Sequence, residues 1–191
     1  MRLGRLGAAI LFVLAGAMAR ANDEPYVGPV AQFVIAHVKP WIDDPLIVSA
    51  VKAQNAVYAD LDQAAIDALD QTWRIEVESD AHPMVDRVLA SPLSNFLRRK
   101  QEQSEGMITE IFVTDAKGLN VGQSDVTSDY WQGDEDKFRK SFGAGHGALF
   151  IDPPERDEST QILQCQASMT VVDETGRPIG AITVGVNLDQ L

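Results

Sequence analysis

The stretch that decides the fold is EIFVTDAKGLNV, residues 110–121, which places two β-rich runs on either side of a turn. The turn is Asp115–Gly118, with aspartate at its first position and glycine at its fourth, as type I turns favour. The apolar run before the turn starts at Ile108, and the return strand extends to Gln123. Two β-rich runs around such a turn predict an antiparallel hairpin.

Three more strands are predicted after the hairpin, over residues 148–151, 161–172 and 178–188. The 161–172 run alternates apolar and polar residues, so we expect it to have one buried face and one face that is polar or solvated. A second Asp-x-x-Gly turn, residues 173–176, joins the last two strands. The second half of the chain, residues 107–191, is therefore predicted to form a five-stranded antiparallel sheet.

Residues 22–106 carry helical patterns instead. One helix is expected over residues 28–39. A second helix begins after a cap at Asp43 or Asp44, because Pro45 then occupies the first helical turn, where proline is favoured.

Two further helices complete this helical region. One is expected after Asp60, with Trp73 among its apolar residues, and another begins at Ser91–Pro92, a cap followed by proline. A run of helices followed by a run of strands is typical of an α+β fold, in which helices pack on an antiparallel sheet.

The first 21 residues have the pattern of a signal peptide. Arg2 and Arg5 form a basic start, residues 6–17 are apolar, and small residues lead to Ala21. This apolar run is too short to cross a bilayer as a helix, which takes about 20 residues. We therefore expect cleavage after Ala21 and a periplasmic location. An uncleaved membrane anchor is the alternative.

Charge and composition exclude several kinds of partner. The chain is 45% hydrophobic and 23% charged, as is common in soluble globular proteins. Loss of the first 21 residues removes three arginines and no acid, which takes the net charge from −12 to −15. Such a charge argues against nucleic acid and anionic lipid as partners. Cys165 is the single cysteine of the sequence, so the chain has no internal disulfide.

The segment TSDYWQGDEDKF, residues 127–138, mixes aromatic, hydroxyl and charged side chains. Two interpretations stay open. It is a loop with a cap at Ser128 or Asp129 that leads into a short helix over residues 134–142, or it is the wall of a small-molecule pocket with aromatic sides and a few polar groups. The candidate ligand-binding residues are Thr127, Ser128, Asp129, Tyr130, Trp131, Asp134, Lys137 and His146.

The charged candidates suit different ligands. Lys137 suits a carboxylate, whereas Asp129 or Asp134 suits an amine. If Asp134 and Lys137 lie on one helix they are neighbours, so a surface ion pair between them is the structural alternative. The acids at 134–136 lack the ligand spacing of a calcium loop, so we expect no metal. His146 lies in a glycine-rich loop, from which it could reach a pocket.

No catalytic motif occurs in the sequence. It has no Walker loop, no nucleophile elbow and no dinucleotide fingerprint, and its three histidines are far apart. We therefore expect neither enzyme activity nor a cofactor. A hydrolase that uses Asp129 or His146 is the remaining catalytic hypothesis.

The hairpin, the TSDYWQGDE run after it and the ending GRPIGAITVGV, residues 176–186, resemble the extracytoplasmic PAS-like sensor domains called Cache or PDC domains. The resemblance covers roughly residues 30–188. It implies one Cache-like domain over residues 22–191, with a long N-terminal helix and a five-stranded sheet. It also implies a pocket between the sheet and the segment after the second strand. The candidates that it places first are Thr127, Asp129, Tyr130, Trp131 and Lys137.

The resemblance implies a periplasmic sensor that binds an amino acid, an organic acid or an amine. Such domains usually sit between two membrane helices and drive a kinase, chemoreceptor or cyclase, whereas this chain ends at Leu191 without a second membrane helix or output domain. We therefore expect it to signal through a partner, a membrane receptor or histidine kinase, and to form a homodimer through its N-terminal helix. The alternative is a protein–protein interaction module with no small-molecule ligand.

Overall fold

The computed structural model describes residues 24–157 and 161–191. The predicted signal peptide, residues 1–21, lies outside the described residues. The division between a helical region and a sheet region follows from the order of the elements, which is helices up to Glu102 and strands from Ile108 onward, with two short helical segments among them.

The helices form the first half of the described chain, as predicted. They are α1 (Val27–His37), α2 (Lys39–Ile42), α3 (Pro45–Val57), α4 (Gln63–Val77), α5 (Pro83–Leu89), α6 (Pro92–Glu102) and, between strands, α7 (Asp136–Arg139) and the 3-10 helix η1 (Phe142–Ala144). None of the helices in the described part of the chain combines the length and apolar character needed to cross a bilayer.

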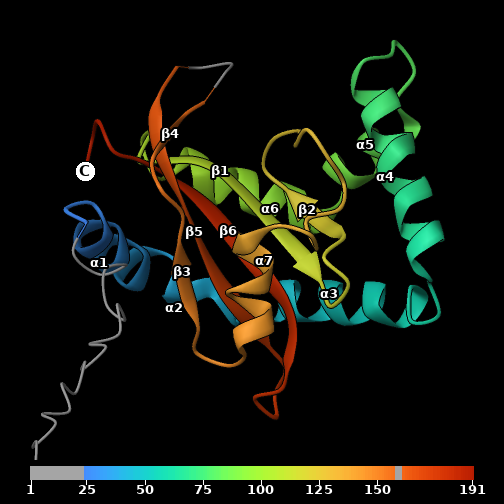
Figure 1. The fold of residues 1–191 in the computed structure, drawn as a ribbon, viewed down its shortest axis with the longest axis horizontal. Coiled ribbons are helices and arrows are strands. Elements are labelled where there is room, and N and C mark those ends of the chain that lie inside the picture. Colours follow the sequence, from blue (N-terminus) through green and yellow to red (C-terminus); the bar gives the residue numbers. More distant parts are fainter. Residues whose placement is uncertain (1–23, 158–160) are drawn as a thin grey trace, which may run out of the picture.

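The strands form one antiparallel sheet (Figure 1). They are β1 (Ile108–Asp115), β2 (Asn120–Gln123), β3 (Leu149–Ile151), β4 (Glu155–Arg156), β5 (Leu163–Val172) and β6 (Pro178–Asn187). Their order is β2-β1-β6-β5-β3, and β4 also pairs with β5. Because β3 and β4 pair with different parts of β5, they form one interrupted edge, and the sheet has five strand positions.

Local sequence signals fix where the helices start. The Asp44 carboxylate accepts the N–H of Leu46 at 2.9 Å, which confirms the predicted cap of α3. The Ser91 hydroxyl accepts the N–H of Ser94 at 3.0 Å, which confirms the cap of α6. Helices α1 and α2 are separate because Pro40 has no N–H to donate to the preceding turn. Helix α1 therefore ends at His37, and Pro40 lies in the first turn of α2.

The main core lies between the sheet and the helices α1, α3 and α6, which cover the same face in Figure 1. Val34, Ile47 and Leu97 are fully buried there against Ile111 and Val184 of the central strands. A second cluster joins α4 and α5 to the segment after β2. Its buried members are Ile66, Trp73, Met84, Val85, Val88, Leu119 and Tyr130.

The two Asp-x-x-Gly turns have the same hydrogen bonds. Asp115 Oδ1 accepts the N–H of Lys117 and Leu119, and Asp173 Oδ1 accepts the N–H of Thr175 and Arg177. Their environments differ, however. Burial raises the pKa of Asp115, whereas the Thr175 hydroxyl, which donates to Asp173, lowers the pKa of Asp173 to about 2.

The second face of β5 is polar, as predicted, but most of it is not solvated. Gln164, Ser168 and Thr170 are each less than 10% exposed. Ser168 hydrogen-bonds Thr183 of β6 at 2.8 Å, and the Thr170 hydroxyl donates to the carbonyl groups of Ser141 and Gly145. The face is polar although it is buried, because β6 and the segment after β2 supply partners for its hydroxyl groups. The alternation of a single strand cannot show that another segment covers it.

The turn glycines give a matched pair of substitutions. Gly118 and Gly176 both have φ above 80°, where alanine costs about 1–2 kcal/mol. A Cβ on Gly118 would also lie 2.6 Å from the backbone of Gly133, whereas nothing lies within 4 Å of one on Gly176. In urea denaturation we expect Gly118→Ala to lower the free energy of unfolding by ~1–3 kcal/mol more than Gly176→Ala. Equal losses would contradict this packing of the turn.

Candidate functional site

A pocket of about 420 Å³ opens on the face of the sheet opposite the main core. Its floor comes from β1 and β5, one wall from the segment 126–137, and another from β4 with the residue after it. It is lined by Glu110, Phe112, Val126, Thr127, Ser128, Asp129, Gln132, Glu135, Lys137, Glu155, Arg156, Asp157, Gln164 and Gln166.

The floor of the pocket carries a carboxylate. Gln166 Nε2 donates to Glu110 Oε1 at 2.8 Å, and Gln164 Nε2 lies 3.4 Å from the same oxygen. Burial raises the pKa of Glu110, because the charged form loses solvation, and the bond from Gln166 only partly offsets this.

Lys137 lies above this floor. Its Nζ contacts Glu135 Oε2 at 2.8 Å, donates to Gln166 Oε1 at 2.8 Å, and lies 5.4 Å from the centre of the Phe112 ring. The ion pair suggested for Lys137 and Asp134 is therefore replaced by one with Glu135. The reason is that α7 begins at Asp136, so Asp134 precedes the helix and the two residues do not share a helical face.

Asp129 belongs to the wall. Its carboxylate accepts hydrogen bonds from Gln132 Nε2 at 2.6 Å and from the Ser128 hydroxyl at 3.3 Å. It also pairs with Arg74 of α4 at 3.2 Å. Asp129 therefore links the pocket to the second cluster.

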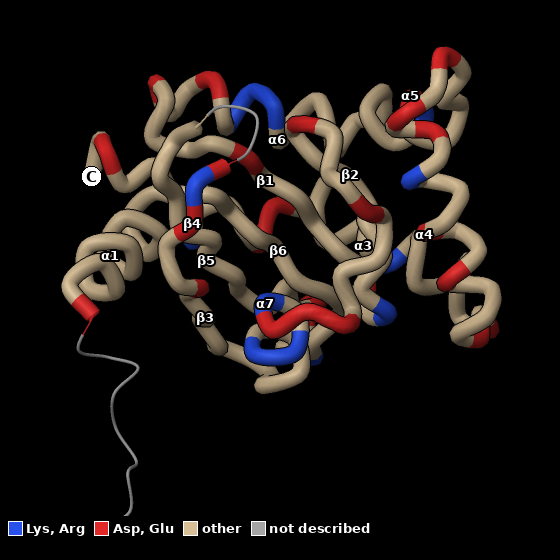
Figure 2. Tube along the Cα trace, turned by 45° about the horizontal axis from the view of Figure 1, so that its top comes forward, with Lys and Arg blue, Asp and Glu red and all other residues tan. Residues whose placement is uncertain are grey.

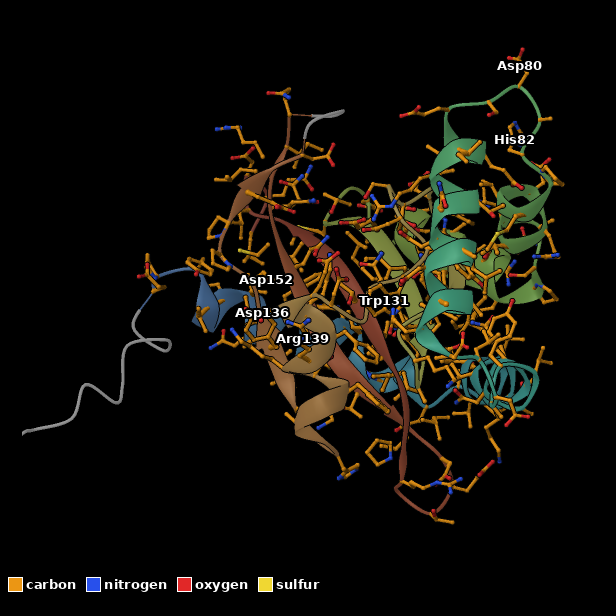
Figure 3. All side chains as sticks on the ribbon, turned by 45° about the vertical axis from the view of Figure 1, so that its right-hand side comes forward. Asp80, His82, Trp131, Asp136, Arg139 and Asp152 are labelled. Carbon is orange, nitrogen blue, oxygen red and sulfur yellow. The ribbon has the colours of Figure 1, made fainter. Side chains whose placement is uncertain are left out.

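A carboxylate on α4 holds this wall in place. Asp70 Oδ1 accepts the backbone N–H of Tyr130 at 2.8 Å and of Trp131 at 3.0 Å, and its Oδ2 accepts from Arg74 at 2.7 Å. Trp131 lies between the sheet and α4 in Figure 3 and forms a β-bridge with Leu119. The segment is thus fastened to α4 on one side and to the start of β2 on the other.

Two aromatic residues strengthen the same attachment. The Trp73 and Tyr130 rings stack with their centres 5.3 Å apart, and both side chains are buried. Trp73 Nε1 donates to the Thr127 carbonyl at 2.8 Å. Trp131 Nε1 donates to the Lys117 carbonyl at 2.8 Å. These aromatic side chains pack in the fold instead of lining the pocket.

The structure brings together half of the predicted site. Thr127, Ser128, Asp129 and Lys137 line the pocket. Tyr130 and Trp131 are adjacent to it in sequence but face α4 and β2, and Asp134 is exposed. His146 lines a separate cavity of about 190 Å³ beside α1.

Sequence reasoning missed the floor of the pocket. Glu110, Gln164 and Gln166 were not candidates, because strand residues were assigned to packing or to solvent. One signal was present: Glu110, Gln164 and Gln166 are long polar side chains within predicted strands.

A larger cavity, of about 580 Å³, lies under α3 near the second Asp-x-x-Gly turn. Two charged groups at this cavity, Lys52 and Glu174, pair with each other at 3.0 Å and are exposed, and the buried Asp173 is already bonded by Thr175 and Arg177 of its own turn. We therefore favour the pocket over β1 and β5, which four of the predicted site residues line. Among the described residues no cluster of three His, Cys, Asp or Glu could hold a metal ion.

Comparison with solved structures identifies the fold. The sensor domain of E. coli DcuS matches with a TM-score of 0.51 over 85% of this chain and 92% of that domain, at 12% identity. The chain has the fold of the extracytoplasmic Cache sensor domains. This confirms the resemblance and the α+β, PAS-like fold class. No family model matches the sequence, and no curated protein does.

Other Cache domains give weaker matches. The sensor domain of the V. cholerae histidine kinase DctB is 14% identical with a TM-score of 0.45, and the match covers 85% of this chain and 50% of that one. The ligand-binding domain of the Campylobacter jejuni chemoreceptor Tlp3, in complex with 4-methylisoleucine, is 10% identical with a TM-score of 0.42. That match covers 80% of this chain and 64% of Tlp3. These neighbours are sensor and receptor domains, not enzymes.

The role of Asp70 can be tested by comparison with a neighbour on α4. Asp70→Ala leaves two backbone N–H groups without an acceptor, each worth about 1–3 kcal/mol when buried, so we expect unfolding free energy to fall by ~2–4 kcal/mol. Asp67 is exposed and bonds only Gln63, so Asp67→Ala should change it by less than ~0.5 kcal/mol. Urea denaturation measures both. Similar small effects would show that the wall does not depend on Asp70.

Glu110 gives a pH-dependent prediction. Between its ordinary pKa of 4.5 and its raised folded pKa, the folded state binds more protons than the unfolded state, so this residue lowers stability as pH rises. The unfolding free energy of Glu110→Gln relative to wild type should therefore increase with pH from 4.5 upward and level off above the folded pKa.

Glu174→Gln is the control for this titration. The pKa of Glu174 is lowered by hydrogen bonding to its own backbone N–H and to Lys52, so the difference between this variant and wild type should change only below 4.5 and be flat above it, where the Glu110→Gln difference still increases. Denaturation curves across about pH 5 to 8, the range in which proteins tend to be most stable, provide the comparison. A pH-independent difference for Glu110→Gln would show that Glu110 is not shifted.

Proposed function

We propose that the chain is a periplasmic sensor domain that binds a small molecule in the pocket over β1 and β5 and signals through a partner protein. The observation that carries the proposal is the pocket wall, residues 126–137, which together with a polar strand face encloses a pocket in a Cache fold. A sensor domain needs a ligand site whose occupation changes a surface that a partner can contact. This wall lines the pocket and is also bonded to helix α4, which is on the surface.

The pocket has the size and composition of a ligand site. Its volume of about 420 Å³ lies within the 300–1,000 Å³ that is common for such sites. Charged and amide groups on its floor and wall could orient a ligand, and Phe112 provides an apolar surface. An amino acid, an organic acid or an amine fits this description.

The attachment of the wall to α4 suggests how binding is transmitted. A ligand that contacts Asp129 acts on Arg74, which also bonds Asp70, and Asp70 holds the wall. Helix α4 exposes two apolar side chains, Ile75 and Val77, which are 59% and 41% accessible. We therefore place the partner, a membrane receptor or histidine kinase, at α4.

Export and self-association complete the proposal. The predicted signal peptide would deliver the mature chain, residues 22–191, to the periplasm. We propose that the homodimer contact lies on α1, where Ile35 is 53% exposed.

A thermal-shift screen of residues 22–191 against amino acids, organic acids and amines tests this function. A compound at about a hundred times its dissociation constant should add about 2.7 kcal/mol of stability. Asp129→Asn keeps the size of the side chain but removes its charge, so it should reduce the shift. Asp134→Asn, on an exposed residue outside the pocket, should not.

Hydrogen exchange then tests the transmission. The stabilising compound should slow exchange in residues 126–137 and in α4, because Asp70 and Arg74 join them. If no compound in the screen raises the melting temperature, the sensor function is wrong, and the interaction module without a ligand becomes the better hypothesis.

A further inference from the structure

The charges around the pocket are unequal. Five of its lining residues carry a carboxylate and two carry a cation. The carboxylates are on Glu110, Asp129, Glu135, Glu155 and Asp157, and the cations are on Lys137 and Arg156. More acids stand next to it: Asp136 lies at the start of α7, and in Figure 3 Asp152 lies beside that helix. Figure 2 shows the acidic residues following one another along the segment that enters α7.

The buried cation is already neutralised. Lys137 pairs with Glu135 and donates to Gln166, and only 12% of its side chain is exposed. Arg156 donates to the Gln161 carbonyl at 2.9 Å and is exposed on β4. A carboxylate ligand would have to share Lys137 with Glu135 and would add a negative charge to an acidic pocket, which costs free energy.

The carboxylate on the floor has no such partner. No Lys or Arg in the described part of the chain lies within ion-pair distance of Glu110, and the charge of Lys137 acts on it only from farther away. Gln164 and Gln166 both donate to its Oε1, and its Oε2 accepts no hydrogen bond from the described residues. A cationic donor in the pocket could therefore bond Glu110 without displacing any protein group.

An amide on the wall also lacks a donor. Gln132 is 2% exposed, and its Oε1 has no hydrogen-bond partner among the described residues. The orientation of this amide is fixed, since its Nε2 must be the atom that donates to Asp129 Oδ1 at 2.6 Å. A buried acceptor without a donor costs about 1–3 kcal/mol. The pocket therefore has acceptors that await a donor, on Glu110 and Gln132, and a ligand that brings N–H groups would satisfy them.

We infer that the pocket selects a small organic cation with a protonated primary amine and rejects dicarboxylates. The inference rests on the proposed sensor function and narrows its ligand class. An ammonium group has three N–H donors and no acceptor, which matches Oε2 of Glu110 on the floor and Oε1 of Gln132 on the wall. A molecule with two ammonium groups could use both.

Two compounds of equal chain length and opposite charge test this selection. At about 10 mM and matched ionic strength, 1,4-diaminobutane should raise the melting temperature of residues 22–191 by at least about 2 °C, and succinate should not. Glu110→Gln keeps the shape of the side chain and should weaken 1,4-diaminobutane at least about tenfold in calorimetric titration. Glu174→Gln, on an exposed residue near α3, should leave the affinity unchanged.

The outcomes separate this inference from the sensor function. Stabilisation by succinate alone would overturn the inference and leave the sensor function in place. Binding of 1,4-diaminobutane with equal affinity by wild type and Glu110→Gln would overturn the site assignment and with it the inference. If neither these compounds nor the amino acids, organic acids and amines of the wider screen stabilise the protein, both proposals fail.

Discussion

One carboxylate, that of Asp70, determines where the segment after β2 lies. It accepts two consecutive backbone N–H groups, of Tyr130 and Trp131, and it also orients Arg74. Backbone donors in a partly buried segment need acceptors, and at this position a side chain on a distant helix supplies them. Stacking of Tyr130 on Trp73 and the bridge of Trp131 to Leu119 both follow from this position.

The sequence predicted the elements whose causes are local. The turns at Asp115 and Asp173 and the caps at Asp44 and Ser91 each depend on residues two to four positions away, and the structure confirms them. The antiparallel sheet followed from the alternation of β5 and from the order of helices and strands.

The site was predicted less well, because its geometry depends on distant contacts. The aromatic residues at 130 and 131 face α4, held by a residue 60 positions earlier that no local pattern marks as their partner. Lys137 pairs with Glu135 because α7 starts later than predicted. Glu110 lines the pocket because β1 lies beside β6, which in turn lies beside β5, so that Glu110 faces the same pocket as Gln164 and Gln166. This strand order cannot be deduced from local patterns.

The polar face of β5 is divided into two functional parts. In one part, Ser168 and Thr170 are satisfied by hydroxyl and carbonyl groups of the protein itself. In the other part, Gln164 and Gln166 face a pocket in which Glu110 and Gln132 retain unused acceptors. The first part closes the fold, and the second leaves hydrogen bonds for a ligand to complete.

The bridge between Leu119 and Trp131 also limits how far the edge of the sheet can pair with another molecule. The outer edge of β2 would otherwise offer free backbone groups to a strand of another molecule, a common route to aggregation. Here the N–H of Asn120 donates to the Tyr130 carbonyl at 3.0 Å, and the N–H of Gln132 donates to the Gly118 carbonyl at 2.8 Å. The opposite edge is interrupted between β3 and β4. The pocket wall therefore also covers the start of this sheet edge. A change that loosens the wall would expose backbone groups of β2 to pairing with another molecule as well as disturb the site.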